Sequence, residues 1–125
     1  MVLVDTSVWI RFLANREPYA SELSELLSQG AVVGHEFVFG ELLVGDRGSR
    51  TELLLAYQQM HQAPTVSHAE VTQFVQARRL NGRGVGWLDL HLGASALVGG
   101  FRLWTVDARF SSLAGELGVA YRSGD

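Results

Sequence analysis

Four acidic residues, each standing within an otherwise apolar stretch, are the side chains of this chain best suited to chemistry. They are Asp5 in MVLVDTSVW, Glu41 in FVFGELLVG, Asp89 in VGWLDLHLG and Asp107 in RLWTVDARF. Burial of an ionised carboxylate is costly unless a positive charge compensates it, so four such acids predict convergence on one cation. Oxygen ligands of this kind select Mg²⁺ or Mn²⁺ over zinc. Such an ion lowers the pKa of a bound water molecule, which can then attack a phosphodiester. The pattern therefore predicts a metal-dependent nuclease site.

Each acid taken alone also has an ordinary structural explanation. Asp5, which Thr6 and Ser7 follow, suits the N-cap of a helix. Glu41 suits a solvated helix surface, Asp89 the first turn of a helix, where the dipole favours negative charge, and Asp107 the start of a turn. The prediction of a metal site rests on their joint placement.

Short apolar runs alternate with segments of helical periodicity along the whole chain. The predicted strands are residues 2–4, 31–33, 101–106 and 119–121. The predicted helices are residues 8–14, 18–29, 36–44, 50–60, 68–80, 88–98 and 111–117. Ser67 and Glu70 have the spacing of a capping box at the start of the fifth helix. This alternation predicts an α/β fold with a parallel sheet that helices cover on both faces.

The predicted elements place the four acids near one edge of the sheet. Asp5 directly follows the first strand, and Asp107 directly follows the third. Ligands of open parallel sheets bind beyond the carboxyl ends of the strands. Glu41 and Asp89 fall on predicted helices that pack against the same sheet, so all four carboxylates are expected near that edge.

The composition predicts one globular domain over residues 1–125, because 47% of the residues are hydrophobic and no linker or repeat is evident. The absence of cysteine excludes disulfides and thiolate zinc sites. The first apolar run ends at Asp5 without a basic segment before it, so we expect no secretory signal and no membrane partner, and a cytoplasmic protein.

The net charge of −3 does not argue against a nucleic-acid substrate. Without the four acids of the predicted site, nine acidic residues remain against ten basic ones, all of them arginine. The rest of the chain is therefore slightly basic, and the arginine fork suits bidentate contacts to phosphate. Uniform use of arginine is equally typical of a GC-rich genome.

Several segments resemble one known family. VLVDTSVWIRFL at residues 2–13 resembles the N-terminal motif of PIN-domain ribonucleases, in particular VapC-type toxins. The resemblance continues through GEL at 40–42, WLDLHLGASAL at 87–97 and LWTVDARFSSLA at 103–114. It implies a three-layer α/β/α sandwich with a short parallel sheet, and an endoribonuclease that depends on Mg²⁺, for which Mn²⁺ substitutes. His91, beside the third acid, departs from the more apolar pattern of the family.

The resemblance also assigns residues and partners. It implies metal binding and catalysis by Asp5, Glu41, Asp89 and Asp107, with Asp5 and Asp89 as the principal ligands. The partners that it implies are an RNA substrate, a second copy of the chain and a cognate antitoxin, in a homodimer and a toxin–antitoxin hetero-oligomer. The residues predicted to contact RNA are Thr6, Arg11, Arg83, Thr105 and Arg109.

Three other functions fit parts of the pattern. A housekeeping PIN-domain nuclease that processes RNA would carry the same acids. A PIN-like module that binds without cutting is disfavoured by the complete acidic set. A phosphoacceptor signalling domain also gathers aspartates at strand ends, but that chemistry normally recruits a lysine, and this chain has none.

Overall fold

Three short parallel strands form the centre of the protein, whose computed structural model describes residues 1–123. They are β1 (Val2–Val4), β2 (Val32–Val33) and β3 (Arg102–Trp104), in the order β2-β1-β3. The central strand β1 is buried along its whole length, with Val2 opposite Val32 on one side and Arg102 on the other. Because both faces of β1 are buried, side chains on either face contact the core, which explains why its sequence is apolar throughout.

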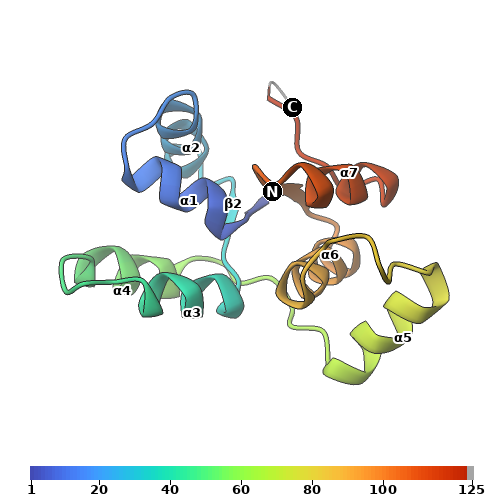
Figure 1. Ribbon diagram of the computed structural model, residues 1–125. Helices are drawn as coiled ribbons and strands as arrows, with labels where there is room; N and C mark the ends of the chain where they lie inside the picture. The colour runs from blue at the N-terminus through green and yellow to red at the C-terminus, as the bar shows by residue number, and fades with distance from the viewer. Residues whose placement is uncertain (124–125) are drawn as a thin grey trace.

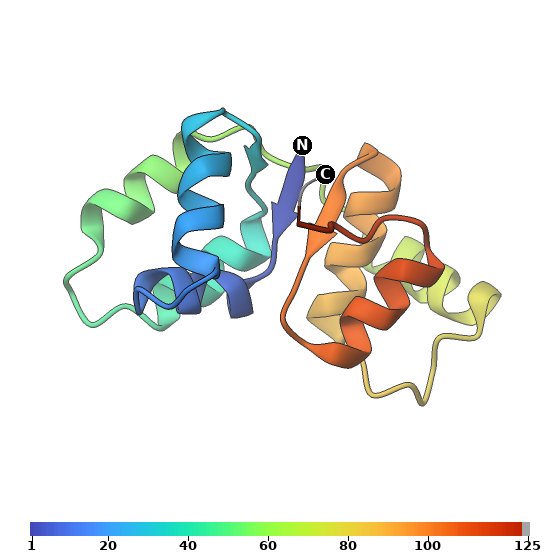
Figure 2. The same cartoon turned by 90° about the horizontal axis from the view of Figure 1, so that it is seen from above.

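Seven helices of the described chain surround this sheet. They are α1 (Thr6–Leu13), α2 (Tyr19–Ser28), α3 (Glu36–Val44), α4 (Thr51–Gln59), α5 (His68–Arg78), α6 (Trp87–Gly99) and α7 (Ala108–Glu116). Seen along the strands, α2 and α7 lie above the sheet and α3, α4 and α6 below it (Figure 1). From above, the strands stand side by side between α1–α4 on one side and α5–α7 on the other (Figure 2). The predicted three-layer α/β/α arrangement is confirmed.

All seven predicted helices are present; α3 has its predicted ends, and each of the other helices differs by one to three residues at one or both ends. α1 begins at Thr6, two residues before its predicted start. α7 begins at Ala108 instead of residue 111, because the Asp107 carboxylate accepts a hydrogen bond from the Phe110 amide and caps the helix early. α5 opens with the predicted cap at Ser67 but ends at Arg78, before a left-handed residue with a φ of 55° at Arg79.

The prediction of a fourth strand at residues 119–121 is wrong. Only Ala120 forms a bridge there, to Leu103 at the outer edge of β3. The predicted strand over residues 101–106 is likewise shorter, since β3 ends at Trp104. The chain beyond Trp104 turns directly toward α7, which brings Asp107 close to the end of β1.

A buried polar network fixes α3 against α4 and α6. His35 is fully buried, and its Nδ1 accepts from the amide of Phe37 at 3.0 Å, which caps α3. Burial lowers the pKa of His35, so the neutral ring carries its proton on Nε2, 3.0 Å from the Ser95 hydroxyl. The Tyr57 hydroxyl accepts from the His35 amide at 2.8 Å. These bonds hold α3 in one orientation, and α3 carries Glu41.

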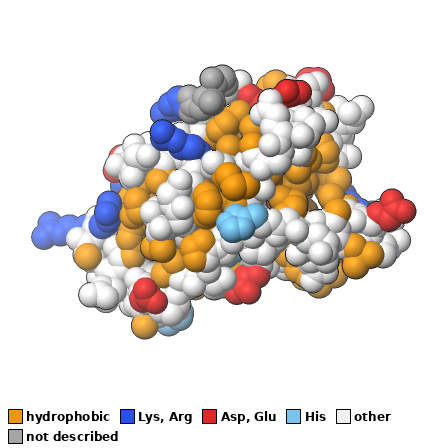
Figure 3. All heavy atoms as spheres, turned by 180° about the vertical axis from the view of Figure 1, so that it is seen from behind, with side chains coloured by type: hydrophobic (Ala, Val, Ile, Leu, Met, Phe, Trp, Pro, Cys, Tyr) orange, Lys and Arg blue, Asp and Glu red, His pale blue; other side chains and the backbone are white. Residues whose placement is uncertain are grey.

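The surface behind the amino end of the sheet is largely hydrophobic. Seen from behind, hydrophobic side chains surround a histidine there, and acidic side chains are scattered singly over the face (Figure 3). Within residues 1–123, no helix combines the length and the apolar character that a membrane span requires.

Candidate metal centre

Asp5 is the buried member of the acidic set. Its backbone follows β1 and donates a hydrogen bond to the carbonyl of Trp104 at the end of β3. The side chain is only 6% exposed, and its Oδ2 accepts from the hydroxyls of Ser7 at 2.7 Å and Thr105 at 2.8 Å. Asp5 occupies the N-cap position of α1, but within the described chain its carboxylate makes no capping bond to the helix backbone. Its orientation is therefore set by the two hydroxyls.

Ser7 is a residue of this site that the sequence analysis did not single out. Besides donating to Asp5, its hydroxyl accepts from the amide of Val106 at 3.1 Å. It therefore ties the start of α1 to the segment between β3 and α7, which is about one hundred residues away in sequence. The sequence feature that could have indicated this role is a serine two residues after an N-cap aspartate. At that position a hydroxyl can donate a hydrogen bond back to the aspartate carboxylate.

Glu41 reaches the site from the other layer. It is an exposed residue of α3, and its Oε1 accepts from the hydroxyl of Thr6 at 2.7 Å. Thr6 is buried in the first turn of α1. Since its hydroxyl has a fixed position, the bond holds the end of Glu41 beside the carboxyl end of the sheet.

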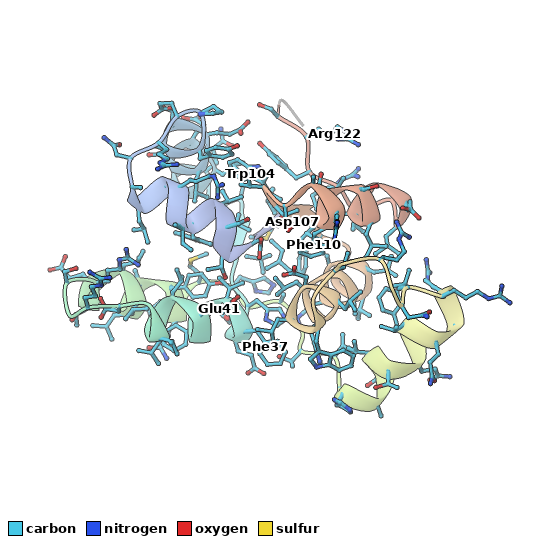
Figure 4. The ribbon with its side chains drawn as sticks, in the orientation of Figure 1. Phe37, Glu41, Trp104, Asp107, Phe110 and Arg122 are labelled. Atoms are coloured by element: carbon cyan, nitrogen blue, oxygen red, sulfur yellow. The ribbon has the colours of Figure 1, made fainter. Side chains whose placement is uncertain are left out.

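Asp107 and Asp89 complete the set. Asp107 stands at the N-terminus of α7, with its Oδ1 on the helix amide and its own amide bonded to the Thr105 hydroxyl at 3.1 Å. Asp89 is half-buried in the first turn of α6. Figure 4 shows Glu41 and Asp107 on opposite sides of the carboxyl end of the sheet.

The charges of the other three acids act on Asp89. Its pKa is raised to about 6, most strongly by burial and then by the negative charges of Asp5, Asp107 and Glu41, in that order. In the described part of the chain, no arginine forms an ion pair with any of the four. The protein therefore gathers carboxylates at one place without neutralising them.

The donor set fits a hard divalent cation. Of the eight carboxylate oxygens, only Asp5 Oδ2, Glu41 Oε1 and Asp107 Oδ1 accept hydrogen bonds from residues 1–123. Each acid thus keeps at least one oxygen for a ligand, and carboxylate oxygens suit Mg²⁺ and Mn²⁺. As the described side chains stand, no three of them converge tightly enough to hold an ion. Mutual repulsion opposes such convergence, so a bound cation requires the side chains to move together.

The three arginines predicted to contact RNA differ in their present contacts. Arg11 donates to the backbone carbonyl of Ser7 at 2.9 Å. Arg83 forms an ion pair with Glu116. Arg109 is exposed, and its guanidinium lies against the loop that precedes α6. Their contact with RNA stays a prediction.

His91 lies in a stack of rings. It is buried, and its ring meets those of Phe37 and Trp87 edge-on, each at 4.9 Å between centroids. Burial lowers its pKa, and its Nδ1 has no hydrogen-bond partner among residues 1–123. The departure from the family pattern at this position therefore places a neutral ring between α3 and α6.

Comparison with known proteins identifies the family. A family model for the PIN domain matches residues 2–116. The chain belongs to the PIN-domain family. This PIN domain is 44% identical over 121 residues to Ribonuclease VapC32 of Mycobacterium tuberculosis, from strain CDC 1551 / Oshkosh and from strain ATCC 25618 / H37Rv. Each alignment covers 96% of this chain and 95% of the relative. The resemblance to VapC-type PIN domains is confirmed.

The raised pKa of Asp89 predicts how stability depends on pH without metal. At pH 7 the carboxylate is charged in both folded and unfolded chains, and the folded state bears the cost of its burial and of the repulsion. Below pH 4 it is protonated in both, so this penalty disappears as pH falls through the window from about 6 to 4. Asp89→Asn should therefore raise the free energy of unfolding at pH 7 by about 1 kcal/mol, after solvent screening of a half-exposed group. Near pH 4, close to the pKa of the unfolded aspartate, the effect should shrink to a small fraction of that value.

The measurement is urea unfolding in EDTA at pH 7 and pH 4. Asp46→Asn is the matched control, because Asp46 lies outside the four acids and asparagine keeps its acceptor oxygen. Equal stability of wild type and Asp89→Asn at pH 7 would contradict the account of crowded charge.

Proposed function

We propose that this PIN domain is a Mg²⁺-dependent endoribonuclease that acts as the toxin of a type II toxin–antitoxin pair, with Mn²⁺ able to substitute. The observation that carries the proposal is the gathering of four uncompensated carboxylates, Asp89 among them, at the carboxyl end of the sheet. The similarity to a protein named as a VapC ribonuclease supports RNA as the substrate.

Asp5 and Asp89 would be the principal ligands, and Glu41 and Asp107 would bind directly or through water. A bound divalent ion supplies a Lewis acid and a water of lowered pKa. The hydroxyls of Ser7 and Thr105 orient Asp5, and the hydroxyl of Thr6 orients Glu41. These fixed donors reduce the reorganisation that a cation must induce.

The proposed partners follow the VapC type. The cognate antitoxin would keep the enzyme inactive in the cytoplasm, and the chain would form a homodimer and a hetero-oligomer with the antitoxin. RNA would lie across the carboxyl end of the sheet. The candidate contacts for its phosphates and hydroxyls are Thr6, Arg11, Arg83, Thr105 and Arg109.

Cleavage of RNA tests the roles of the acids. Asp5→Asn and Asp89→Asn should each reduce cutting at least about 100-fold in Mg²⁺ or Mn²⁺, because each removes a charged ligand from the centre. The assay follows structured RNA on denaturing gels with purified protein. Glu52→Gln, an exposed change on α4, is the control and should cut like wild type. Undiminished cleavage by both aspartate variants would overturn the assigned mechanism.

Growth separates a toxin from a housekeeping nuclease. Expression of the wild-type chain without its antitoxin should arrest growth, because unrestrained cutting depletes an essential RNA. Asp89→Asn should leave growth unaffected at the same protein level. Growth rate after induction is the measurement. An enzyme that is active when purified but harmless when expressed would favour the housekeeping alternative.

A further inference from the structure

A basic pocket borders the acidic site on the side of Glu41. It has a volume of about 440 Å³, and its polar lining consists of Thr6, Glu41, Arg47, Ser49 and Arg50. Thr6 and Glu41 belong to the candidate metal centre, so the pocket and the centre share a wall. The two arginines come from the segment between α3 and α4, for which the sequence analysis predicted no function.

The segment that carries these arginines has a fixed shape. The Asp46 carboxylate accepts from the amides of Gly48 and Arg50, both at 3.1 Å. Those bonds engage one Asp46 oxygen with the backbone. In the described chain neither Arg47 nor Arg50 forms an ion pair. Two guanidinium groups are therefore held at the pocket without an acidic partner of their own.

The charge of the pocket favours an anion. Arg47 and Arg50 face a single lining carboxylate, Glu41, which a cation in the neighbouring centre would neutralise. Arg50 also stands at the N-terminus of α4, where the helix dipole disfavours a positive charge that lacks an anion. The planar forks of arginine match phosphate oxygens in particular.

We propose that Arg47 and Arg50 bind a phosphodiester of the RNA strand next to the one that is cut. The inference rests on the proposed nuclease function and extends it, because it names the contacts that hold the strand beside Glu41. Arg11 and Arg83 are less suited to this task, since each already donates to a carbonyl or a carboxylate of the protein. The pocket thus sets the direction in which the strand leaves the acidic centre.

Binding of RNA at several salt concentrations tests the pocket. All proteins carry Asp89→Asn, so that the RNA stays intact, and a fluorescent single-stranded oligoribonucleotide of mixed sequence is titrated in Mg²⁺. Arg47→Ala and Arg50→Ala should each raise Kd about fivefold and reduce the slope of log K against log salt by about 0.7, the value for one phosphate contact on a single strand. Thermal unfolding checks that each variant is folded.

Arg102→Ala is the matched control. Arg102 opens β3 at the amino end of the sheet, opposite the acids, and among residues 1–123 its guanidinium donates to the carbonyl of Gly118 alone. Its loss removes the same charge and should leave the slope unchanged. Slopes for Arg47→Ala and Arg50→Ala equal to that of Arg102→Ala would overturn the proposal.

Cleavage by chains with an intact Asp89, measured in parallel, separates the two proposals. If wild type cuts RNA while the arginine variants bind like the control, the pocket proposal fails alone. If wild type does not cut but the arginine variants still lose slope, the pocket stands as an RNA site and the nuclease proposal fails. Absence of both cutting and binding overturns both.

Discussion

Repulsion among four carboxylates is the constraint on which the rest of this structure depends. Like charges at one sheet edge oppose folding unless protons or a cation compensate them, and the described chain offers no arginine as an ion-pair partner. Asp89 shows the cost most clearly, because burial together with the charges of the other three acids raises its pKa to about 6. A protein that keeps such an arrangement gives up stability at this site, and a bound cation would restore it.

Two parts of the fold hold these charges in place. β1 and β3 set Asp5 and Thr105 side by side through parallel pairing, and the Ser7 hydroxyl joins the same junction. The buried His35 network fixes the orientation of α3, and with it Glu41. The polar groups of the His35 network do not contact the acids, but they determine where Glu41 lies.

Much of this arrangement follows from the sequence, because parallel strands end at a common edge. Asp5 and Asp107 follow the first and third strands, which suffices to place both near that edge. The contact of Ser7 with Val106 depends on the pairing of segments about one hundred residues apart, which local patterns do not encode. Arg47 and Arg50 become candidates for a binding site only in the folded protein, where α1 and the segment after α3 line one pocket. The prediction of a strand at residues 119–121 was wrong, because this apolar run forms a bridge to β3 at one residue only.

Calorimetric titration with Mn²⁺ tests most directly whether the four acids form one cation site. Wild type should bind the ion and release protons on binding near pH 6, where Asp89 is partly protonated, and affinity should be higher at pH 7.5 than at pH 5.5. Asp89→Asn should weaken binding at least about tenfold and abolish most of the proton release. Equal affinity and equal proton release in wild type and Asp89→Asn would contradict the account.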